Sequence, residues 1–406
     1  MNYVIERLNT RGDGLAQGLR APLTLPGEVV SGVVQSDCLT DVRIETPSEA
    51  RVSAPCAHFR SCGGCQLQHA RDEFVADWKR QVVADALQSA GLETDIRSTI
   101  TSPDRSRIRA TFAARRTKKG AMAGFHGRRS DTIVPVPDCI LVVPQLTAAL
   151  PLAEDLAREG ASRKGALVVT VTDSDEGLDV AVRGGKPLDG PLRVTLAAMA
   201  ETHRLARLTW EDEVIAMRHP PTQPMGRAQV IPPPGAFLQA TRHGQDTLVA
   251  AVRDIMGDAA RVVDLFAGSG TFALPLAEGA EVDAFEGDAD MIAALDRGWR
   301  EAHGLKRVRA EARDLFRRPL MPDELTHDAA VIDPPRAGAA AQIAELAQSQ
   351  VPVIAHVSCN PGTFARDAKT LTDAGYRLDF VQPVDQFRWS SHVELVAAFR
   401  RPHMPA

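Results

Sequence analysis

The chain has 406 residues, of which 44% are hydrophobic and 24% charged, and its formal net charge is −5. A single compact hydrophobic core is unusual at this length, so we expect two or three domains. No apolar run approaches the ~18–20 residues that a membrane span needs, and the first residues lack a basic-then-apolar signal pattern. We therefore expect a cytoplasmic protein without membrane contact, and we expect a monomer.

The first 225 residues predict two domains. Residues 1–52 contain short β-type runs separated by glycine and proline, which predicts a small barrel. Residues 53–225 begin with a cysteine-rich loop and continue with mixed strand and helix patterns, so we expect a central α+β domain. Within it, residues 72–90 predict an amphipathic helix that is a candidate to pack on the catalytic domain. Its apolar stripe consists of Phe74, Val75, Trp78, Val82, Ala86 and Leu87. Six prolines between 220 and 234 predict an extended crossover.

Residues 226–406 alternate regularly between strand and helix patterns. We expect strands at 261–266, 281–286, 328–332, 352–357, 376–384 and 393–399, and helices at 245–256, 271–278 and 289–303. Such alternation predicts an α/β domain with a doubly wound, Rossmann-like and largely parallel sheet. Ligands in such sheets bind outside the carboxyl ends of the strands, so we expect the chemistry in the loops that follow them.

A glycine-rich turn follows the first of these strands. Gly268 and Gly270 allow the backbone to approach a ligand closely, and Asp264 precedes them. Glu286 ends the next strand, where a carboxylate can accept both ribose hydroxyls. An acid before the glycines suits the amino-acid part of S-adenosylmethionine better than a pyrophosphate. We therefore favour that cofactor over a dinucleotide or a purely structural turn.

Two further loops carry candidate catalytic groups. Asp333 opens an Asp-Pro-Pro-Arg motif, in which Arg336 replaces the aromatic residue that amino-group methylases use. Cys359 lies at the end of another strand and before a helix, whose N-terminus would lower the pKa of the thiol. A thiolate that adds to carbon 6 of uracil makes carbon 5 nucleophilic toward a sulfonium methyl group. A base such as Glu394 must then remove the carbon 5 proton.

Each of these residues also has a purely structural interpretation. Arg336 could form a salt bridge, Cys359 could be a small buried apolar residue, and Glu394 could be a surface charge on an edge strand. The position of Cys359 in the same crevice as the glycine-rich turn favours the catalytic interpretation.

The region between residues 97 and 129 contains ten basic residues and a single acid, Asp104. A solvated basic hairpin would explain the run by itself. Together with the chemistry above, a surface that contacts RNA phosphates is the favoured interpretation.

Four of the six cysteines form a candidate metal site. Cys56, Cys62 and Cys65 lie within ten residues, and Cys139 follows far along the chain. Four thiolates suit zinc or an iron–sulfur cluster, and the spacing alone leaves both open, although the isolated fourth cysteine favours a cubane. Cys38 is expected to be an ordinary barrel residue.

The motifs of the second half resemble those of the bacterial RNA uridine-5 methyltransferase family. Asp-Leu-Phe-x-Gly-x-Gly, Asp-Pro-Pro-Arg-Ala-Gly, Ser-Cys-Asn-Pro-x-Thr-x-x-Arg-Asp and a late His-x-Glu occur in the family's order, within residues 237–399. The resemblance implies that Cys359 is the nucleophile and Glu394 the base. The implied cofactor contacts, beside the turn at Gly268, are Gln239, Phe266, Glu286, Asp314 and Asp333. Thr241 stands where the family usually has an asparagine, and its hydroxyl can still form a hydrogen bond there.

The resemblance extends to the N-terminal half. Residues 1–52 look like the small OB-like TRAM domain that binds RNA in this family, and the four cysteines match those that hold a [4Fe-4S] cluster in its ribosomal-RNA members. The implied function is transfer of a methyl group from S-adenosylmethionine to carbon 5 of a single-stranded or flipped-out uridine in 23S rRNA. Two alternatives stay open: a transfer-RNA uridine-5 methyltransferase, and an RNA cytosine-5 methyltransferase, although Pro334-Pro335 replaces the Pro-Cys typical of the latter.

Overall fold

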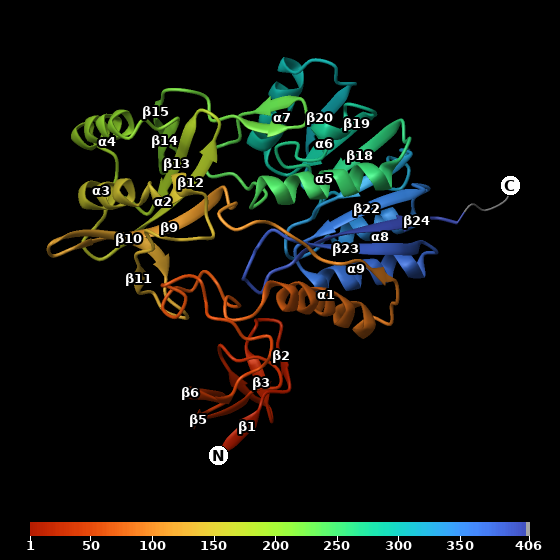
Figure 1. Cartoon of the computed structure of the whole chain (residues 1–406). Helices are drawn as coiled ribbons and strands as arrows, with labels where there is room; N and C mark the ends of the chain where they lie inside the picture. Colours follow the sequence, from red (N-terminus) through yellow and green to blue (C-terminus); the bar gives the residue numbers. More distant parts are fainter. Residues whose placement is uncertain (403–406) are drawn as a thin grey trace.

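The computed structural model describes residues 1–402, which form three large sheets and one two-stranded hairpin. In Figure 1 the N-terminal sheet (red) lies below the other two, and the C-terminal sheet (teal to blue) lies beside the central one (yellow to green). No helix among the described residues is both long enough and apolar enough to span a bilayer.

Six short strands form the N-terminal sheet, in the order β1-β5-β6-β4-β3-β2. They are β1 (Asn2–Val4), β2 (Arg7–Leu8), β3 (Gly14–Ala16), β4 (Leu19–Ala21), β5 (Val29–Gln35) and β6 (Cys38–Thr46). The two ends of this order belong to one segment, in which the Ile5 N–H donates to the Glu28 carbonyl and the Glu6 N–H donates to the Leu15 carbonyl. The sheet is therefore curled around a small core of its own. An RNA-binding, TRAM-like barrel stays a prediction for this region.

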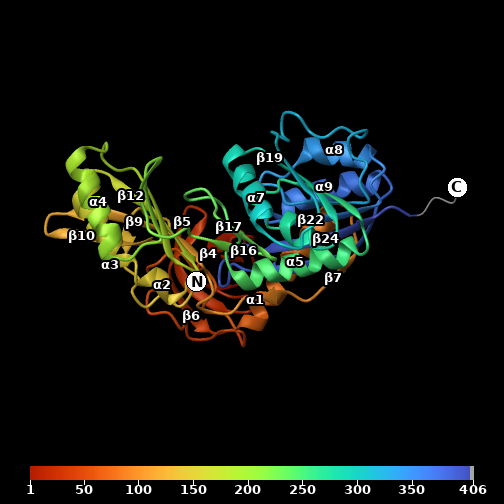
Figure 2. The ribbon, with the colours of Figure 1, turned by 90° about the horizontal axis from the view of Figure 1, so that it is seen from above.

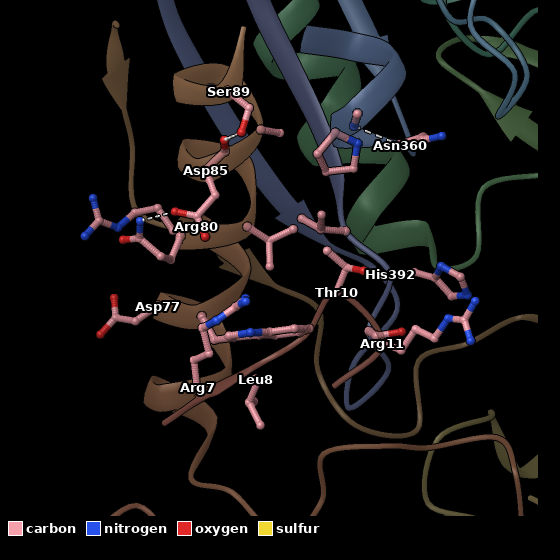
Figure 3. A pocket seen from close by; sticks show the side chains of 18 of the residues that line it. Arg7, Leu8, Thr10, Arg11, Asp77, Arg80, Asp85, Ser89, Asn360 and His392 are labelled. Carbon is pink, nitrogen blue, oxygen red and sulfur yellow. Dashed lines mark hydrogen bonds between the residues drawn. The ribbon is translucent and has the colours of Figure 1, made fainter. Parts of the chain in front are cut away.

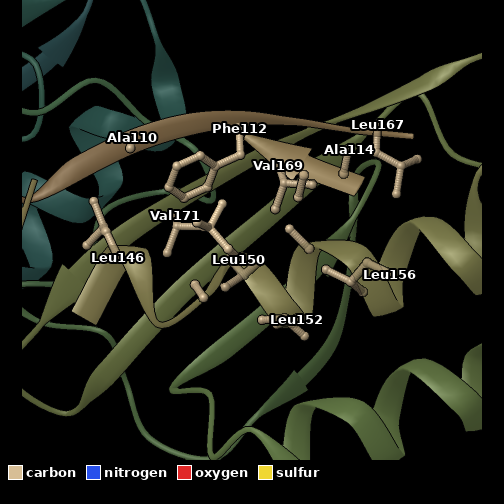
Figure 4. Close-up of a cluster of buried hydrophobic side chains, with 14 of the residues drawn as sticks. Ala110, Phe112, Ala114, Leu146, Leu150, Leu152, Leu156, Leu167, Val169 and Val171 are labelled. Atoms are coloured by element: carbon tan, nitrogen blue, oxygen red, sulfur yellow. The ribbon is translucent and has the colours of Figure 1, made fainter. Parts of the chain in front are cut away.

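The central sheet has seven strands, in the order β11-β10-β9-β12-β13-β14-β15. They are β9 (Arg109–Thr117), β10 (Gly120–His126), β11 (Ile133–Val134), β12 (Ala166–Ser174), β13 (Gly177–Arg183), β14 (Arg207–Trp210) and β15 (Glu213–Met217), with helices α2 (Pro144–Thr147), α3 (Leu150–Gly160) and α4 (Gly190–Thr202). Figure 4 shows its core, where Phe112 of β9 and Val169 of β12 meet Leu150 and Leu156 of α3. Burial of such side chains contributes roughly 1.5–3 kcal/mol each.

The prolines between 220 and 234 do not form a simple extended crossover, so this prediction is wrong in part. β16 (Gln223–Met225) and β17 (Ala228–Val230) pair as a hairpin, and Gly226 supplies φ 62° in its turn. Pro224 is tolerated inside β16 because a two-stranded hairpin leaves one side of each strand unpaired.

The C-terminal sheet runs in the order β20-β19-β18-β21-β22-β24-β23-β7, and β8 also pairs with β23. Its strands are β7 (Asp95–Ile96), β8 (Ile100–Thr101), β18 (Arg261–Leu265), β19 (Glu281–Glu286), β20 (Val308–Ala312), β21 (Ala329–Ile332), β22 (Val353–Ser358), β23 (Arg377–Asp385) and β24 (Glu394–Arg400). The strands from β20 to β22 are parallel, whereas β24 runs antiparallel to β22 and β23. The prediction of a doubly wound α/β domain with a largely parallel sheet is confirmed. The sheet is mixed at one end, where β24 is antiparallel to its neighbours.

Helices cover both faces of this sheet (Figure 2). They are α1 (Asp72–Ser89), α5 (Arg242–Met256), α6 (Ala273–Leu276), α7 (Ala289–Glu301), α8 (Ala340–Gln348) and α9 (Pro361–Asp373). Leu248 of α5 packs in one core with Val262, and Phe364 of α9 packs in another with Val263. Successive side chains of β18 thus enter different cores, as expected of a strand that is buried on both faces.

Helix α1 belongs in space with the C-terminal sheet, although it lies inside the predicted central region. It packs against α9 and β23, as Figure 1 shows, and β7 and β8 then extend the sheet past β23. Its buried side consists of Val75, Lys79, Val83 and Leu87. The predicted apolar stripe is therefore only partly the buried one.

Candidate active site

The carboxyl ends of the parallel strands bring three predicted cofactor contacts together. Leu265 ends β18 and pairs with β19 on one side and with Ile332 of β21 on the other. Phe266, Glu286 and Asp333 occupy the next positions of these three strands. The strand register alone therefore places these three residues along one edge of the sheet.

The antiparallel pair β22–β24 brings the two proposed catalytic residues together. Ser358, the last residue of β22, pairs with Leu395 of β24. The same register puts Cys359 opposite Glu394. Cys359 is half-buried, and Glu394 is 3% exposed.

The glycine-rich turn has one open face and one packed face. Phe266 adopts φ 65° and Gly268 φ 56°, and the Gly268 N–H donates to Glu286 Oε2 at 3.1 Å. A Cβ added at Gly268 would meet no atom within 4 Å, whereas at Gly270 it would lie 2.7 Å from Leu274 Cδ1. The open face at Gly268 is what a cofactor-binding turn requires.

Buried carboxylates lie at the same edge. Asp264 is fully buried, and neither of its oxygens has a hydrogen-bond partner among residues 1–402. Burial, and then the nearby Asp333, raise the pKa of Asp264 well above its usual range. Burial and Glu286 raise the pKa of Asp333 to about 7. Unpaired, mutually repelling carboxylates favour a cationic ligand, and S-adenosylmethionine carries an ammonium and a sulfonium group.

Asp314 follows β20 and stabilises a turn next to Phe266. Its Oδ1 accepts hydrogen bonds from the N–H groups of Phe316, at 3.0 Å, and Arg317, at 3.3 Å. The Phe316 ring lies 5.3 Å from the Phe266 ring, centroid to centroid. Phe316 is 49% exposed, so an aromatic pair borders the cofactor turn. Phe316 was not predicted, and the available signal was a phenylalanine two residues after Asp314.

A buried chain of side-chain hydrogen bonds joins the cofactor edge to Glu394. Gln386 Nε2 donates to Glu394 Oε2 at 3.1 Å and to Gln239 Oε1 at 2.6 Å. Gln239 Nε2 lies 3.4 Å from Asp333 Oδ2. Burial, and then Asp333, raise the pKa of Glu394 well above its usual range, while the hydrogen bond from Gln386 acts in the opposite direction. Gln386 was not predicted, because nothing in its local sequence distinguishes it from a surface amide.

Thr241 is the N-cap of α5. Its hydroxyl accepts the Gly244 N–H at 2.8 Å and lies 2.9 Å from the hydroxyl of Ser102. An N-cap hydroxyl of this kind satisfies a free amide at the start of a helix. The Thr241 hydroxyl therefore does form a hydrogen bond, as expected, but this bond stabilises the start of α5.

The thiol of Cys359 is less acidic than the sequence predicts. Burial, followed by Glu394 and Asp333, raises its pKa to about 11, and Arg336 acts in the opposite direction. The sequence predicted a pKa lowered by a helix N-terminus, whereas burial and two nearby carboxylates raise the pKa in the structure. Within residues 1–402 the guanidinium of Arg336 forms no ion pair, so the salt-bridge interpretation of Arg336 fails.

A groove leads from Cys359 to the N-terminal sheet (Figure 3). Arg80 and Asp85 of α1 line one side, and Thr10, Arg11 and His392 lie on the other. Its charged lining residues are Glu6, Arg7, Arg11, Asp77, Arg80, Asp85 and Arg336. Cys359, the candidate nucleophile, thus faces a groove whose walls come from three separate parts of the chain.

The four clustered cysteines line one small cavity of ≈ 20 Å³. Burial raises the pKa of Cys65 to about 12, and Cys139, Cys62 and Cys56 act in the same direction, so the four thiols are close together. Within the described residues, however, no group of three or more His, Cys, Asp or Glu side chains is arranged to hold a metal ion. The four predicted ligands therefore share a cavity, but no metal-binding arrangement is found among the described residues, and the [4Fe-4S] cluster stays a prediction.

Six of the ten bases of the predicted basic surface are exposed, and four, Arg107, Arg109, Arg115 and Arg128, are half-buried. Arg128 donates to the Phe59 and Cys65 carbonyls, and Arg129 pairs with Asp13 of the N-terminal sheet at 2.6 Å. The remaining exposed bases of this segment include Arg105, Arg116, Lys118 and Lys119. The phosphate-contacting interpretation therefore applies to fewer residues than the ten that the sequence offered.

The doubly wound sheet and its cation-favouring edge are those of an S-adenosylmethionine-dependent methyltransferase, and similarities to known proteins show that the chain is one. Residues 302–401 match the tRNA (Uracil-5-)-methyltransferase family. The chain is 42% identical over 402 residues to an RNA methyltransferase of Brucella suis, covering 98% of this chain and 97% of that protein. It is 44% identical over 408 residues to an RNA methyltransferase of Rhizobium meliloti, with 98% of each covered. The chain therefore belongs to the RNA methyltransferase family, as an RNA uracil-5 methyltransferase.

Two further similarities extend over almost the whole chain. A 23S rRNA (uracil(1939)-C(5))-methyltransferase of a Shewanella species is 29% identical over 432 residues, covering 98% of this chain and 95% of that protein. The crystal structure of Pyrococcus abyssi tRNA (uracil-54, C5)-methyltransferase in complex with S-adenosyl-L-homocysteine has a TM-score of 0.76 at 23% identity, covering 98% of this chain and 99% of that one. The second similarity shows that the fold is shared.

Proposed function

We propose that this enzyme methylates carbon 5 of a uridine in 23S rRNA through a covalent bond between Cys359 and carbon 6. The observation that carries the proposal is the position of Cys359 opposite Glu394, at the inner end of the groove. Addition at carbon 6 and deprotonation at carbon 5 need a thiolate and a base at neighbouring ring atoms. The ladder of β22 and β24 supports that arrangement.

Cys359 carries out the addition to the ring, and Glu394 carries out the final deprotonation. When bound, S-adenosylmethionine supplies a methyl group on a sulfonium. The Cys359 thiol loses its proton to solvent, and its sulfur bonds to carbon 6, which turns the ring into an enolate with a nucleophilic carbon 5. Carbon 5 takes the methyl group, and the electron pair of the broken bond stays on the cofactor sulfur. Glu394 then removes the carbon 5 proton, and that electron pair restores the ring double bond as the Cys359–carbon 6 bond breaks.

The cofactor residues are also part of the proposal. Gln239, Phe266, Gly268, Glu286, Asp314 and Asp333 would hold S-adenosylmethionine. The open face of the turn at Gly268 supports this assignment, as do the unpaired oxygens of Asp264. A buried acid without a partner is costly unless a bound group satisfies it.

RNA would enter through the groove of Figure 3. A uridine inside a helix is inaccessible to Cys359, so it must be flipped out or single-stranded. Arg7, Arg11 and Arg80 line the path and can contact phosphates. The full-length relationship to the Shewanella rRNA enzyme favours 23S rRNA. The name of the matched family makes a transfer-RNA uridine the second candidate.

A [4Fe-4S] cluster on Cys56, Cys62, Cys65 and Cys139 is the metal group we propose. Each thiolate of such a cluster binds a different iron, and the cavity that the four thiols share supports the assignment. Its role would be structural. Gln66 and Leu67, which follow Cys65, donate backbone hydrogen bonds to the carbonyl of Trp389, at 2.7 and 2.9 Å. The cysteine loop is therefore attached to the loop that precedes Glu394.

The test is incubation of the purified protein with tritiated S-adenosylmethionine and with rRNA or tRNA from a strain that lacks the gene. We expect label in 23S rRNA, at one position that yields 5-methyluridine on nuclease mapping. Label in tRNA alone would replace the rRNA proposal by the second candidate. Label in 5-methylcytidine, or none in either RNA, would overturn the proposed function.

A further inference from the structure

Gln386 lies between two residues that are fixed in the fold. Asp385 accepts a hydrogen bond from Lys79 Nζ at 2.6 Å, and the Phe387 carbonyl accepts another from the same ammonium at 3.1 Å. Gln386 itself is 1% exposed. A Cβ added at Gly244 would lie 2.7 Å from the Gln386 Cβ, so the first turn of α5 closes over this side chain. Its amide therefore has little freedom to move.

The orientation of the Gln386 amide is determined by a backbone group. The Ala240 N–H, which can only donate, lies 2.8 Å from Gln386 Oε1. The opposite end of the amide must then be the NH2 group, whose two hydrogens point to Gln239 Oε1 and Glu394 Oε2. Side-chain amides are often ambiguous, but here the flipped assignment would place an oxygen against two acceptors and an NH2 against a donor.

Two consequences follow for the neighbours. Since Gln239 Oε1 accepts, its Nε2 must face Asp333 and the cofactor edge, as a donor. Since Glu394 Oε2 accepts from an amide, this hydrogen bond favours a proton on Oε1 over one on Oε2.

We infer that Gln386 is a positioning residue of the methyl transfer reaction, which holds Oε2 of Glu394 so that Oε1 takes the carbon 5 proton, and which keeps the Gln239 NH2 turned toward the cofactor. This inference rests on the proposed role of Glu394 as the base. The step it governs transfers the carbon 5 proton to Oε1, while the carbon 5–hydrogen electron pair forms the ring double bond and Cys359 leaves. Gln386 touches neither the ring nor the methyl group and acts through Glu394 and Gln239.

The test compares proton release with methyl transfer in one turnover. The substrate is 23S rRNA tritiated at carbon 5 of uridine, with carbon-14 in the cofactor methyl group. For Gln386→Met, which has similar length and no donor, we expect tritium release to slow relative to methyl transfer by about tenfold or more. This is a part of the ~10²–10⁴-fold that a positioned base contributes. A methylated protein–RNA complex should then accumulate on denaturing gels. The ratio of the two labels within one turnover does not depend on cofactor affinity.

The matched control is Gln382→Met, on β23, the strand that ends one residue before Gln386. Gln382 is also buried, at 7% exposed, but its amide donates to the Ser98 and Pro383 carbonyls, away from Glu394. A loss of activity through misfolding should affect both variants, and the label ratio should change only for Gln386→Met. An unchanged ratio in Gln386→Met would overturn the inference.

A second variant covers the case in which Gln386→Met does not fold. Gln386→Glu keeps the shape and can donate only when protonated, so we expect its label ratio to approach the native value as the pH falls. A ratio independent of pH would contradict the inference. Glu394→Gln distinguishes a failure of the proposed function from a failure of the inference about Gln386. If this variant releases tritium normally, the proposed base is wrong. If it stalls while the Gln386 variants behave as the native enzyme, only the role of Gln386 is wrong.

Discussion

Lys79 on α1 and Asp385 at the end of β23 form a fully buried ion pair, with 2.6 Å between Nζ and Oδ1. The two residues are 306 positions apart, and their pair attaches α1 to the strand that precedes Gln386. Burial lowers the pKa of Lys79, and Asp385 acts in the opposite direction.

We therefore expect Lys79→Met to destabilise the fold strongly, because it leaves the Asp385 carboxylate buried and unpaired. The expected loss in free energy of unfolding is about 3–5 kcal/mol, measured by chemical denaturation. Arg300→Ala is the control: Arg300 pairs with Asp296 on the surface of α7, so we expect no measurable change. Equal effects of the two substitutions would contradict the importance of burial at the Lys79 pair.

The pH dependence of adduct formation tests the state of the Cys359 thiol. Its pKa is raised to about 11, so the thiol is protonated at neutral pH and the thiolate fraction rises with pH. Because only the thiolate attacks, trapping of RNA that contains 5-fluorouridine should accelerate about tenfold per pH unit below that pKa. Gel-shift kinetics under denaturing conditions measure the trapping rate.

Bound S-adenosylmethionine adds a positive charge, so we expect the acceleration to level off at lower pH when the cofactor is present. Cys359→Ala should trap no RNA at any pH. Trapping by the alanine variant would assign the nucleophile elsewhere, and a native rate independent of pH would contradict the raised pKa.

The parallel strands were the most predictable part of the fold. The predicted strand 281–286 coincides with β19, and 261–266 differs from β18 by one residue, because each contains three buried apolar residues. β20 was not predicted, since it lies at the edge of the sheet and carries Arg309 and Glu311. An edge strand with alternating charges gives no apolar signal.

The candidate site was predictable where residues follow strands, as Asp333 and Cys359 do. Lys79 and Gln386 escaped prediction for a physical reason. Their roles arise from partners far away in the chain, and a buried lysine on a helix has the same local sequence as an exposed one. Only tertiary packing decides which of these polar groups lose their water.

The two glycines of the cofactor turn should differ in what they affect. Gly268→Ala places a methyl group in open space at φ 56°, so it should cost only roughly 1–2 kcal/mol of backbone strain and mainly weaken cofactor binding. Gly270→Ala, at φ 102°, puts a Cβ 2.7 Å from Leu274 and 3.0 Å from Leu295, so it should lower the melting temperature more. Calorimetric titration and thermal unfolding separate the effects. Native cofactor affinity in Gly268→Ala would show that the cofactor does not occupy this face.

Substitution of single cysteines tests whether the thiol cavity holds iron. Cys65→Ser removes one of four thiols that line it, so protein purified without oxygen should lose iron and its visible charge-transfer absorbance. Cys38→Ser is the matched control, because Cys38 is a free thiol at the start of β6 and outside the cavity. The backbone link from the cysteine loop to Trp389 predicts that Cys65→Ser also lowers the rate of methyl transfer without changing cofactor affinity. A colourless native protein that contains zinc, or equal iron content in the two variants, would contradict the cluster assignment.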